Sequence, residues 1–490
     1  MQTNEVQKVL DICLEAGASD ARIIHTVSDQ TSVSLYNEDV DKIHNASDCS
    51  VFLQLFVDGR YGTFSTNMLD EAGLREFIGN AVKLTKLLEK DECRHLAPAE
   101  LCYKGGGGDL LLLDPAADSV SAQQGKALAV QMAQSLCSHI DGGPLQSCET
   151  EFGSSFEHEV LADTAGFCQT RDASFYTVSA GCSFIDKDGS RPQSWWPDAN
   201  VFFSKLDAGR CADIAYQRGL DRLGARRIDA GRYNIVVENG SAAKFVSPLL
   251  SALSGASLQQ NNSFLLDSLG KKMFPSKLTI VDNPHKPSAF GARFYDGEGL
   301  ATKRCNVIDE GVVSMYFLTS YYADKLGMAP TVDSVSVVEM VPDAGGLDAQ
   351  MATLGKGVLI TGFNGGNHNP ITGDFSYGIE GFWFENGCRQ FPIHEMNVTG
   401  NYLDLWARLA AVGDDPLTLF SMQLPTLSFE GISLTYKKKK TGAPRQSLYR
   451  KLECILLFLI PLAVAVVEFI YATGSVDKFH LTSVERVRSV

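Results

Sequence analysis

Alternating apolar and polar residues between about residues 21 and 66 limit the possible folds of this chain more than any other feature. The stretch contains "ARIIHTVSD", "TSVSLYNEDVDKIHN" and "CSVFLQLFVDGRYGTFST", with the pair Asp58-Gly59 between two apolar runs. A period of two predicts strands that bury one face, and Asp-Gly between such strands predicts a hairpin turn. We therefore expect the chain to begin with an antiparallel sheet.

Helical periodicity flanks this sheet. The segment 4–17 has apolar residues at helical spacing and a glycine at its end, and "LDEAGLREFIGNAVKLTKLLE" predicts a helix of about six turns. Residues 121–140 predict a further amphipathic helix, and alternation returns from 147 to about 185 as a meander. This pattern predicts an α+β fold, with an N-terminal helix-flanked antiparallel sheet domain over residues 1–230.

The pattern changes near Ala230, where we place the domain boundary. Residues 231–255 read as a strand, an Asn-Gly turn and a helix, and the chain is then mostly strand and turn up to about Asn401. A helix, "NYLDLWARLAAVG", and a strand, "TLSFEGISL", follow. We expect a strand-rich, barrel-like C-terminal domain over residues 231–431.

Charge and cysteine content exclude some classes of function. The net charge is −15, and because ten Lys and Arg face four Asp and Glu after residue 431, the rest of the chain carries about −21. Such an acidic body argues against a nucleic-acid partner. The twelve cysteines form no C-x-x-C pair and no secretory signal precedes them, so we expect reduced, mostly buried thiols and a cytoplasmic body.

Common catalytic motifs are missing from the sequence. The nine histidines include no pair on neighbouring helical turns, and "HEMNVT" at His394 has no second histidine four or five residues later. There is no G-x-S-x-G elbow, P-loop or dinucleotide fingerprint. Cys182 and Cys388 read as strand cysteines in apolar surroundings.

Two glycine-containing segments supply the candidate binding residues. In "FYDGEGLATKR" two carboxylates flank a glycine that would let the backbone approach a ligand; the alternative is a strand-turn-strand with solvated acids. The segment "FNGGNHNPITGDFSYGIEGFWFENG" predicts hairpins with aromatic residues in a core or cleft. The candidate cleft or ligand-contact residues are Asp296, Gly297, Glu298, His368, Asn369, Asp374 and Tyr377.

An apolar helix-like run, "AAKFVSPLLSAL" (242–253), is followed by small polar residues up to Asn262. Two interpretations fit this pattern. The polar stretch is either an ordinary surface connection, or a loop beneath a helix that carries a reactive site in relatives.

From about residue 5 to 431 the chain resembles the TldD/PmbA family of two-subunit metallopeptidases. The resemblance rests on "EAGASDARIIHTVSDQTSVSLYNEDVDKI", "NNSFLLDSLGKKMFP", "IVDNPHKPSAFGARFYDGEGLATKRCNVIDEG" and "GVLITGFNGGNHNPITGDFSYGIEGFWFENG". In TldD-like members a helix bears H-E-x-x-x-H, whose histidines bind zinc and whose glutamate is the general base. To within a residue or two, the corresponding helix here is "KFVSPLLSALSG", where Ser247 to Ala252 spans the same spacing; it contains no His or Glu and one proline.

The resemblance therefore implies the metal-free PmbA/TldE-like subunit, with no catalytic or metal-binding residue and no cofactor in this chain. It implies a heterodimer with a TldD-like subunit that holds the zinc, and unfolded peptides as the substrate. An extended peptide would pair with a sheet edge through main-chain hydrogen bonds. Activity is expected only together with that partner.

Two other functions remain as alternatives. In the first, the chain would be a stand-alone protein that binds peptides or a small ligand. In the second, it would be a hydrolase that uses Asp296, Glu298 and His394, although nothing in the sequence brings these residues together.

The last part of the sequence departs from the resemblance. Residues 432–453 form a basic linker, residues 454–472 are mostly apolar, and residues 473–490 end the chain. These 19 mostly apolar residues can just cross a bilayer, which predicts a C-terminal anchor. Pro461 and Glu468 count against it, since a charge near the bilayer centre costs about 2.5–3.5 kcal/mol. The alternative is an aberrant C-terminus with no selected role.

Overall fold

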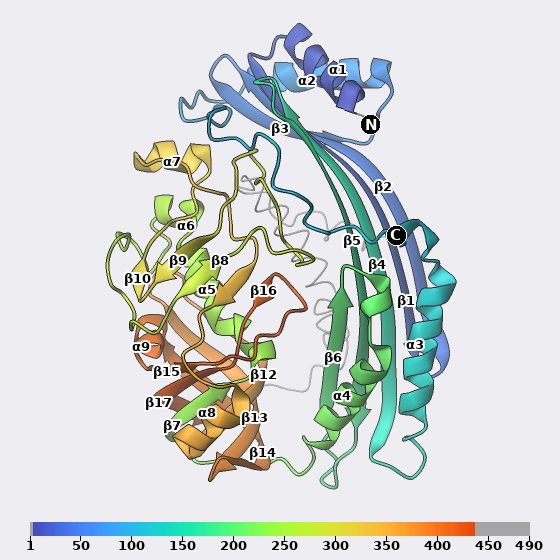
Figure 1. The fold of residues 1–490 in the computed structure, drawn as a ribbon, viewed down its shortest axis with the longest axis vertical. Helices are drawn as coiled ribbons and strands as arrows, with labels where there is room; N and C mark the ends of the chain where they lie inside the picture. The colour runs from blue at the N-terminus through green and yellow to red at the C-terminus, as the bar shows by residue number, and fades with distance from the viewer. Residues whose placement is uncertain (1–2, 437–490) are drawn as a thin grey trace, which may run out of the picture.

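The computed structural model describes residues 3–436, which form three β-sheets and the helices that pack on them (Figure 1). The predicted linker from residue 437 on, the predicted anchor at 454–472 and the final residues 473–490 lie outside the described residues. No helix within residues 3–436 is both long and apolar enough to cross a bilayer.

The first sheet is antiparallel and has six strands in the order β3-β2-β1-β4-β5-β6. Its strands are β1 Asp20–Tyr36, β2 Asp39–Val57, β3 Arg60–Thr66, β4 Leu145–Asp163, β5 Cys168–Phe184 and β6 Gln193–Asn200. β1 and β4 pair from Arg22↔Asp163 to Tyr36↔Glu149, which makes the long curved strands in Figure 1. The predicted antiparallel sheet and its meander are confirmed.

Four helices cover one face of this sheet. They are α1 Thr3–Glu15, α2 Glu71–Thr85, α3 Ala122–Cys137 and α4 Ala208–Leu220. Because side chains alternate between faces, Ile23 of β1 packs in the core beneath α1 and α2 and Val33 in the core beneath α3 and α4. Arg22 and Ile24 point to the opposite face, where Ile24 meets Tyr295 of the second half of the chain.

A five-stranded barrel forms the centre of the second half. Its neighbours are β14-β13-β12-β7-β17, and pairing of β14 with β17 from Met396↔Tyr436 to Thr399↔Ser433 closes it. The strands are β7 Gly231–Val237, β12 Lys356–His368, β13 Asp374–Glu385, β14 Cys388–Asn401 and β17 Leu427–Tyr436, with β15 Leu409–Val412 added beside β17. The predicted α+β fold with a barrel-like C-terminal part is therefore confirmed.

A small third sheet lies beside the barrel, in the order β10-β9-β8-β11-β16. Its strands are β8 Ile280–Asp282, β9 Cys305–Asp309, β10 Val312–Val313, β11 Val338–Met340 and β16 Met422–Gln423. The helices of this half are α5 Ala243–Ala252, α6 Gly255–Gln259, α7 Ser320–Leu326, α8 Leu347–Leu354 and α9 Tyr402–Ala407. Strands β1–β6 precede residue 230 and β7–β17 follow it; the domain boundary there stays a prediction.

Several local predictions need correction. The helix expected to have about six turns is α2, which has 15 residues, and "NYLDLWARLAAVG" divides into the short helix α9 and strand β15. The polar stretch after α5 is no plain loop: Ser254 accepts a hydrogen bond from the Ser257 backbone and starts α6. Helices α7 and α8 also interrupt the region expected to be strand and turn.

The eleven cysteines within residues 3–436 are free thiols, but only five of them are buried, so the prediction that most are buried is wrong. Cys182 lies buried in β5 as predicted, whereas Cys388 is exposed at the start of β14, so its predicted apolar surroundings are wrong. The Sγ atoms of Cys137 and Cys148 lie 3.5 Å apart, well beyond the roughly 2.05 Å of a disulfide bond.

Candidate functional site

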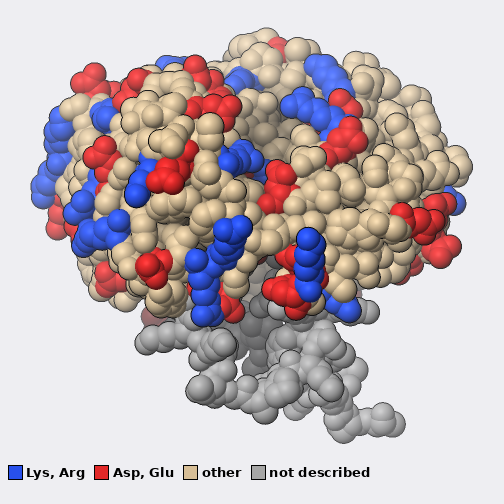
Figure 2. Space-filling model, turned by 90° about the horizontal axis from the view of Figure 1, so that it is seen from below, with Lys and Arg blue, Asp and Glu red and all other residues tan. Residues whose placement is uncertain are grey.

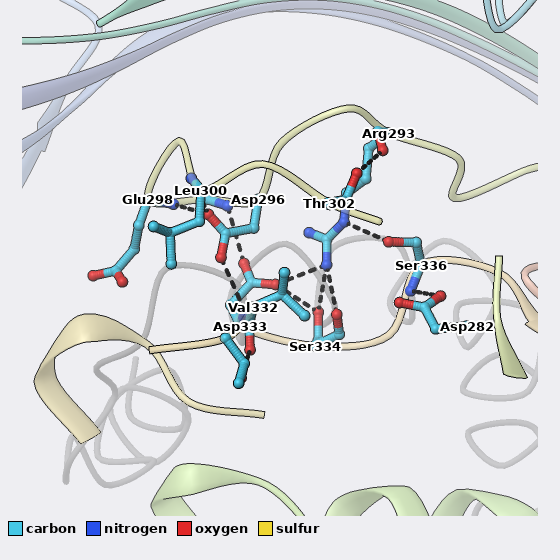
Figure 3. A network of polar contacts seen from close by, with 12 residues as sticks. Asp282, Arg293, Asp296, Glu298, Leu300, Thr302, Val332, Asp333, Ser334 and Ser336 are labelled. Atoms are coloured by element: carbon cyan, nitrogen blue, oxygen red, sulfur yellow. Dashed lines mark hydrogen bonds and ion pairs between the residues drawn. The ribbon is translucent and has the colours of Figure 1, made fainter. Parts of the chain in front are cut away.

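The segment "FYDGEG" forms a tight turn between β8 and β9, which we call the Asp296 turn (residues 293–302). The Asp296 backbone N–H donates to Leu300 O, and Gly299 N–H donates to Asp296 O, both at 3.0 Å. The Asp296 carboxylate accepts three backbone N–H groups, from Glu298, Leu300 and Asp333, at 2.9–3.0 Å (Figure 3). Asp296 is thus the residue that fixes the turn.

The acids of this turn are not solvated, so the alternative of exposed acids at a strand-turn-strand is wrong. Asp296 is 2% exposed and the Glu298 side chain 14%. Burial raises the pKa of Asp296 well above its usual range, and the carboxylates of Asp333 and Glu298 raise it further.

A buried ion pair supports the turn from below. Arg293 Nη2 donates to Asp333 Oδ1 at 2.7 Å and to the Ser334 carbonyl at 2.8 Å, and Arg293 Nε donates to Ser336 Oγ at 2.9 Å (Figure 3). The other oxygen of Asp333 accepts the Gly297 N–H at 3.0 Å. The glycine expected to approach a ligand therefore uses its N–H for Asp333.

Asp282, at the end of β8, belongs to the same polar network (Figure 3). One of its oxygens accepts the N–H groups of Ser336 and Val337 at 2.8 and 3.0 Å. Burial raises the pKa of Asp282 from 3.8 to about 6, although these hydrogen bonds act in the opposite direction.

The raised pKa of Asp282 predicts a pH-dependent stability difference for Asp282→Asn. The carboxyl ionises near pH 3.8 in the unfolded chain and near 6 in the folded one, so folding favours its protonated form. This contribution is complete below pH 3.8 and is lost as the pH rises through 6, a change of about 3 kcal/mol. Urea unfolding at several pH values should show the Asp282→Asn variant gaining on the wild type from about pH 4.5 to about pH 8; an equal difference at both pH values would contradict this.

Beside the Asp296 turn lies a small hollow, partly open to solvent, which we call the Arg22 hollow. One wall is the first sheet, with Arg22 of β1, Gln54 and Phe56 of β2 and Tyr61 of β3. The other walls are the loop residues Arg94 and His95, Gly297 and Glu298 of the turn, and Thr319 and Tyr321 at α7. The hollow therefore lies between the two halves of the chain.

The second group of candidate residues lies on β12 and β13. The hydroxyl of Tyr377, which is 1% exposed, contacts Tyr402 OH at 2.7 Å and His368 Nδ1 at 3.2 Å. Partial burial and the ammonium group of Lys244 lower the pKa of His368. Burial raises the pKa of Tyr377, so this phenol stays neutral at physiological pH.

Asn369 and Asp374 shape the tip of the β12–β13 hairpin. Asn369 Oδ1 accepts the Ile371 N–H at 2.9 Å, and Asn369 N–H donates to Asp374 O at 2.8 Å. Hydrogen bonds from Asn401 and Thr372 lower the pKa of Asp374. These contacts are typical of a turn, and whether either residue touches a ligand stays a prediction.

The structure thus forms two separate groups. Asp296, Gly297 and Glu298 share one network, His368 contacts Tyr377, and Asn369 contacts Asp374; no hydrogen bond or ion pair among residues 3–436 joins the first group to the others. His394 is an exposed residue of β14 whose N–H donates to Arg226 O. We find no contact that would support a hydrolase built from Asp296, Glu298 and His394.

Sequence reasoning missed the arginines of this region. Arg22, 2% exposed, and Arg293, with 11% of its side chain exposed, are buried beside carboxylates, and Arg94 lines the hollow. One signal was available for Arg22: it lies in the apolar run "ARII", where a charged residue on a buried strand needs a partner.

On the face drawn in Figure 2, Lys and Arg are interspersed with Asp and Glu, and no continuous basic surface covers that face. The absence of a nucleic-acid partner, inferred from net charge, stays a prediction.

Comparison with known proteins places the chain in a family. A model described as PmbA/TldA metallopeptidase domain 1 matches residues 21–85, and one described as PmbA/TldA metallopeptidase C-terminal domain matches residues 230–436, together more than half of the chain. The chain belongs to the TldD/PmbA family. The resemblance found in the sequence is therefore confirmed.

Individual members of the TldD/PmbA family extend the match. The metalloprotease PmbA of Escherichia coli O157:H7 is 29% identical over 436 residues, covering 85% of this chain and 94% of that protein. The structure of a candidate modulator of DNA gyrase from Bacteroides thetaiotaomicron is 37% identical, covers 88% of this chain and 98% of its own, and has a TM-score of 0.85. TldE from Thermococcus kodakarensis shares the fold, at 16% identity and a TM-score of 0.78 over 88% of this chain and 100% of its own.

The zinc that this family implies does not fit the matching helix here. Helix α5, which matches the zinc helix to within a residue or two, contains no His, Cys, Asp or Glu, so none of its side chains is a usual zinc ligand. Between residues 3 and 436, no group of three or more His, Cys, Asp or Glu side chains is arranged to hold a metal ion. We therefore derive no zinc-dependent step from this chain.

Proposed function

We propose that this chain is the non-catalytic, PmbA/TldE-like subunit of a heterodimeric zinc metallopeptidase that degrades or processes unfolded peptides. The observation that carries the proposal is helix α5, which occupies the place of the zinc helix but is built for packing. Its buried residues are Phe245, Val246, Pro248, Leu249, Leu250 and Ala252.

The remaining side chains of α5 support the same conclusion. Ser247 Oγ lies 3.3 Å from the sulfur of Met422, and Lys244 Nζ lies 4.5 Å from the centre of the Tyr377 ring. Pro248 has no N–H, and the helix contains no Glu or Asp that could act as the general base. A helix with these residues has no group that activates water.

The relatives support the peptidase assignment at the level of the family. Curated relatives are named metalloprotease PmbA, and TldE shares the fold. In the proposed pair a TldD-like subunit supplies the zinc, the ligands and the general base. This chain supplies part of the surface that admits an unfolded peptide, and β3, an edge strand of the first sheet, has the geometry for main-chain pairing with it.

A pull-down from native cells tests the proposed pairing. The tagged chain is isolated under mild conditions and zinc in the eluate is quantified, with a matched sample from cells that express the tag alone as the control. We expect a TldD-like chain with H-E-x-x-x-H to co-elute with about one zinc per pair. A lone chain that carries stoichiometric zinc would overturn the proposal.

One observation favours a second function, a stand-alone protein that binds peptides. Both halves of this chain contribute walls to the Arg22 hollow, which contains the buried cation Arg22. A lone, zinc-free chain in the pull-down would favour this second function.

A further inference from the structure

The Arg22 hollow contains a buried cation with unused hydrogen-bond donors. Arg22 is 2% exposed; its Nη1 donates to Gln54 Oε1 at 3.0 Å and lies 3.7 Å from Glu298 Oε1. Its Nε and Nη2 have no hydrogen-bond partner in the described part of the chain. Buried donors without partners are rare because each costs free energy, so these atoms point to an acceptor from outside the chain.

The two unused nitrogens define the chemistry of that acceptor. Nε and Nη2 form one edge of the planar guanidinium, and their N–H groups run parallel to each other. A carboxylate accepts two such parallel bonds with its two oxygens, which is the strongest and most directional pairing that arginine makes.

The charges around the hollow also favour a single anion. Arg22 and Arg94 line it with two positive charges, against one carboxylate, Glu298, which already accepts the Ser320 N–H at 2.6 Å. His95 contacts Leu96 O at 2.7 Å and Asp324 at 2.8 Å through its two ring nitrogens, so it forms its own ion pair. One positive charge therefore remains without a counter-charge.

That charge belongs to Arg94. Its guanidinium lies between two aromatic rings, 3.4 Å from the centre of Tyr321 and 4.5 Å from that of Tyr61. No carboxylate within residues 3–436 forms an ion pair with it. Stacking fixes the guanidinium plane and leaves its N–H edges available for a ligand.

We propose that the Arg22 hollow binds the carboxylate of an unfolded peptide, with Arg22 holding it bidentately, Arg94 adding the second charge, and the rings of Tyr61 and Tyr321 contacting the residue that bears it. The peptide as the carrier rests on the proposed function; the carboxylate rests on the hollow alone. A free C-terminus and an acidic side chain share this chemistry, and the test separates them.

The test measures binding of three labelled peptide probes to the purified full-length chain. The first is acetyl-Ala-Ala-Leu with a free C-terminal carboxylate, the second its C-terminal amide, and the third acetyl-Ala-Glu-Leu amide. We expect the free acid to bind at least about tenfold more tightly than the amide, since the amide cannot accept two parallel N–H bonds. If the glutamate probe binds as tightly as the free acid, the carboxylate site stands and acidic side chains are its source.

Variants assign the binding to the hollow. Arg22→Lys keeps the positive charge but removes the two parallel N–H groups of the guanidinium. This variant should reduce the affinity for the free acid to nearly that for the amide. Arg94→Gln, at the half-buried wall, should weaken it several-fold and serves if an Arg22 variant does not fold. Arg75→Gln is the matched control, because Arg75 is an exposed arginine paired with Glu15 and Glu71 outside the hollow.

Equal affinity for all three probes, or no effect of either hollow variant, would overturn the inference. Because this measurement uses the chain alone, its outcome is independent of the pull-down. If the pull-down yields a zinc-containing pair but the purified chain binds all three probes equally, only the inference is refuted. If the pull-down yields a lone chain but the purified chain binds the free acid tightly, only the proposed function is refuted.

Discussion

Replacement of Asp333 by alanine is expected to lower the free energy of unfolding by about 3–5 kcal/mol, because it leaves the buried guanidinium of Arg293 without its carboxylate. The Asp333 side chain is 0% exposed and lies 2.7 Å from Arg293 Nη2. The same change removes the acceptor of the Gly297 N–H and so loosens the Asp296 turn. Urea unfolding of the wild type and the variant at neutral pH measures the loss.

A double variant separates the charge effect from a general loss of packing. Arg293→Met combined with Asp333→Leu removes both charges and keeps similar volumes, so it should recover much of the stability lost in Asp333→Ala. A single Asp333→Ala variant that loses less than about 1 kcal/mol would show that the ion pair does not hold this loop.

Replacement of Phe245 by alanine is expected to cost about 3–5 kcal/mol as well, through the cavity that it leaves. Phe245 is 0% exposed on α5 and packs against four rings of the barrel strands, with ring centres 5.4–6.5 Å apart: Phe363, Phe375, Tyr377 and Phe429. A loss of this size would identify α5 as a packing element, as the proposed function requires.

Lys244→Ala is the matched control on the same helix. Lys244 is exposed, and its ammonium group lies over the face of the Tyr377 ring. Because such a contact is weak at an exposed site, Lys244→Ala should lower the free energy of unfolding by less than about 1 kcal/mol. If Lys244→Ala lowers the free energy of unfolding as much as Phe245→Ala does, the contribution of α5 to stability does not come from burial of its apolar side chains.

Local patterns were sufficient to predict much of this fold. Asp58 and Gly59 both have positive φ, of 51° and 76°, which is the backbone of the tight hairpin that Asp-Gly predicts between β2 and β3. The alternation along β1 reflects packing near both of its ends, where Ala21 and Ile23 lie in one helix-covered core and Val33 and Leu35 in the other. These features depend on neighbours in sequence, which a single sequence displays.

Features that depend on distant contacts could not be predicted. The barrel closes through pairing of β14 with β17, and the sequence of neither strand indicates which strand it pairs with. Trp406 ends the predicted helix early because it packs fully buried against Phe429 and draws the following residues into β15. Tertiary packing outweighed helix propensity at this point.

The candidate site was predicted only in part for the same reason. Asp296 and Glu298 stood out in the sequence because they flank a glycine. Their partners are distant in sequence: Asp333 lies 37 residues from Asp296, and Arg22 lies 276 residues from Glu298, so these contacts form only in the folded structure. Conversely, Asn369 and Asp374 were selected from a segment rich in turn residues, and their contacts are those of a turn. Polar residues in such segments stabilise turns whether or not they bind ligands.

The most direct test of the central claim is hydrolysis of unfolded casein by the purified chain, alone and together with its TldD-like partner, with and without a zinc chelator. The account predicts no hydrolysis by the chain alone, hydrolysis by the pair, and loss of that hydrolysis on chelation, because it assigns the zinc and its ligands to the proposed TldD-like subunit. Chelator-sensitive hydrolysis by the chain alone would contradict the account.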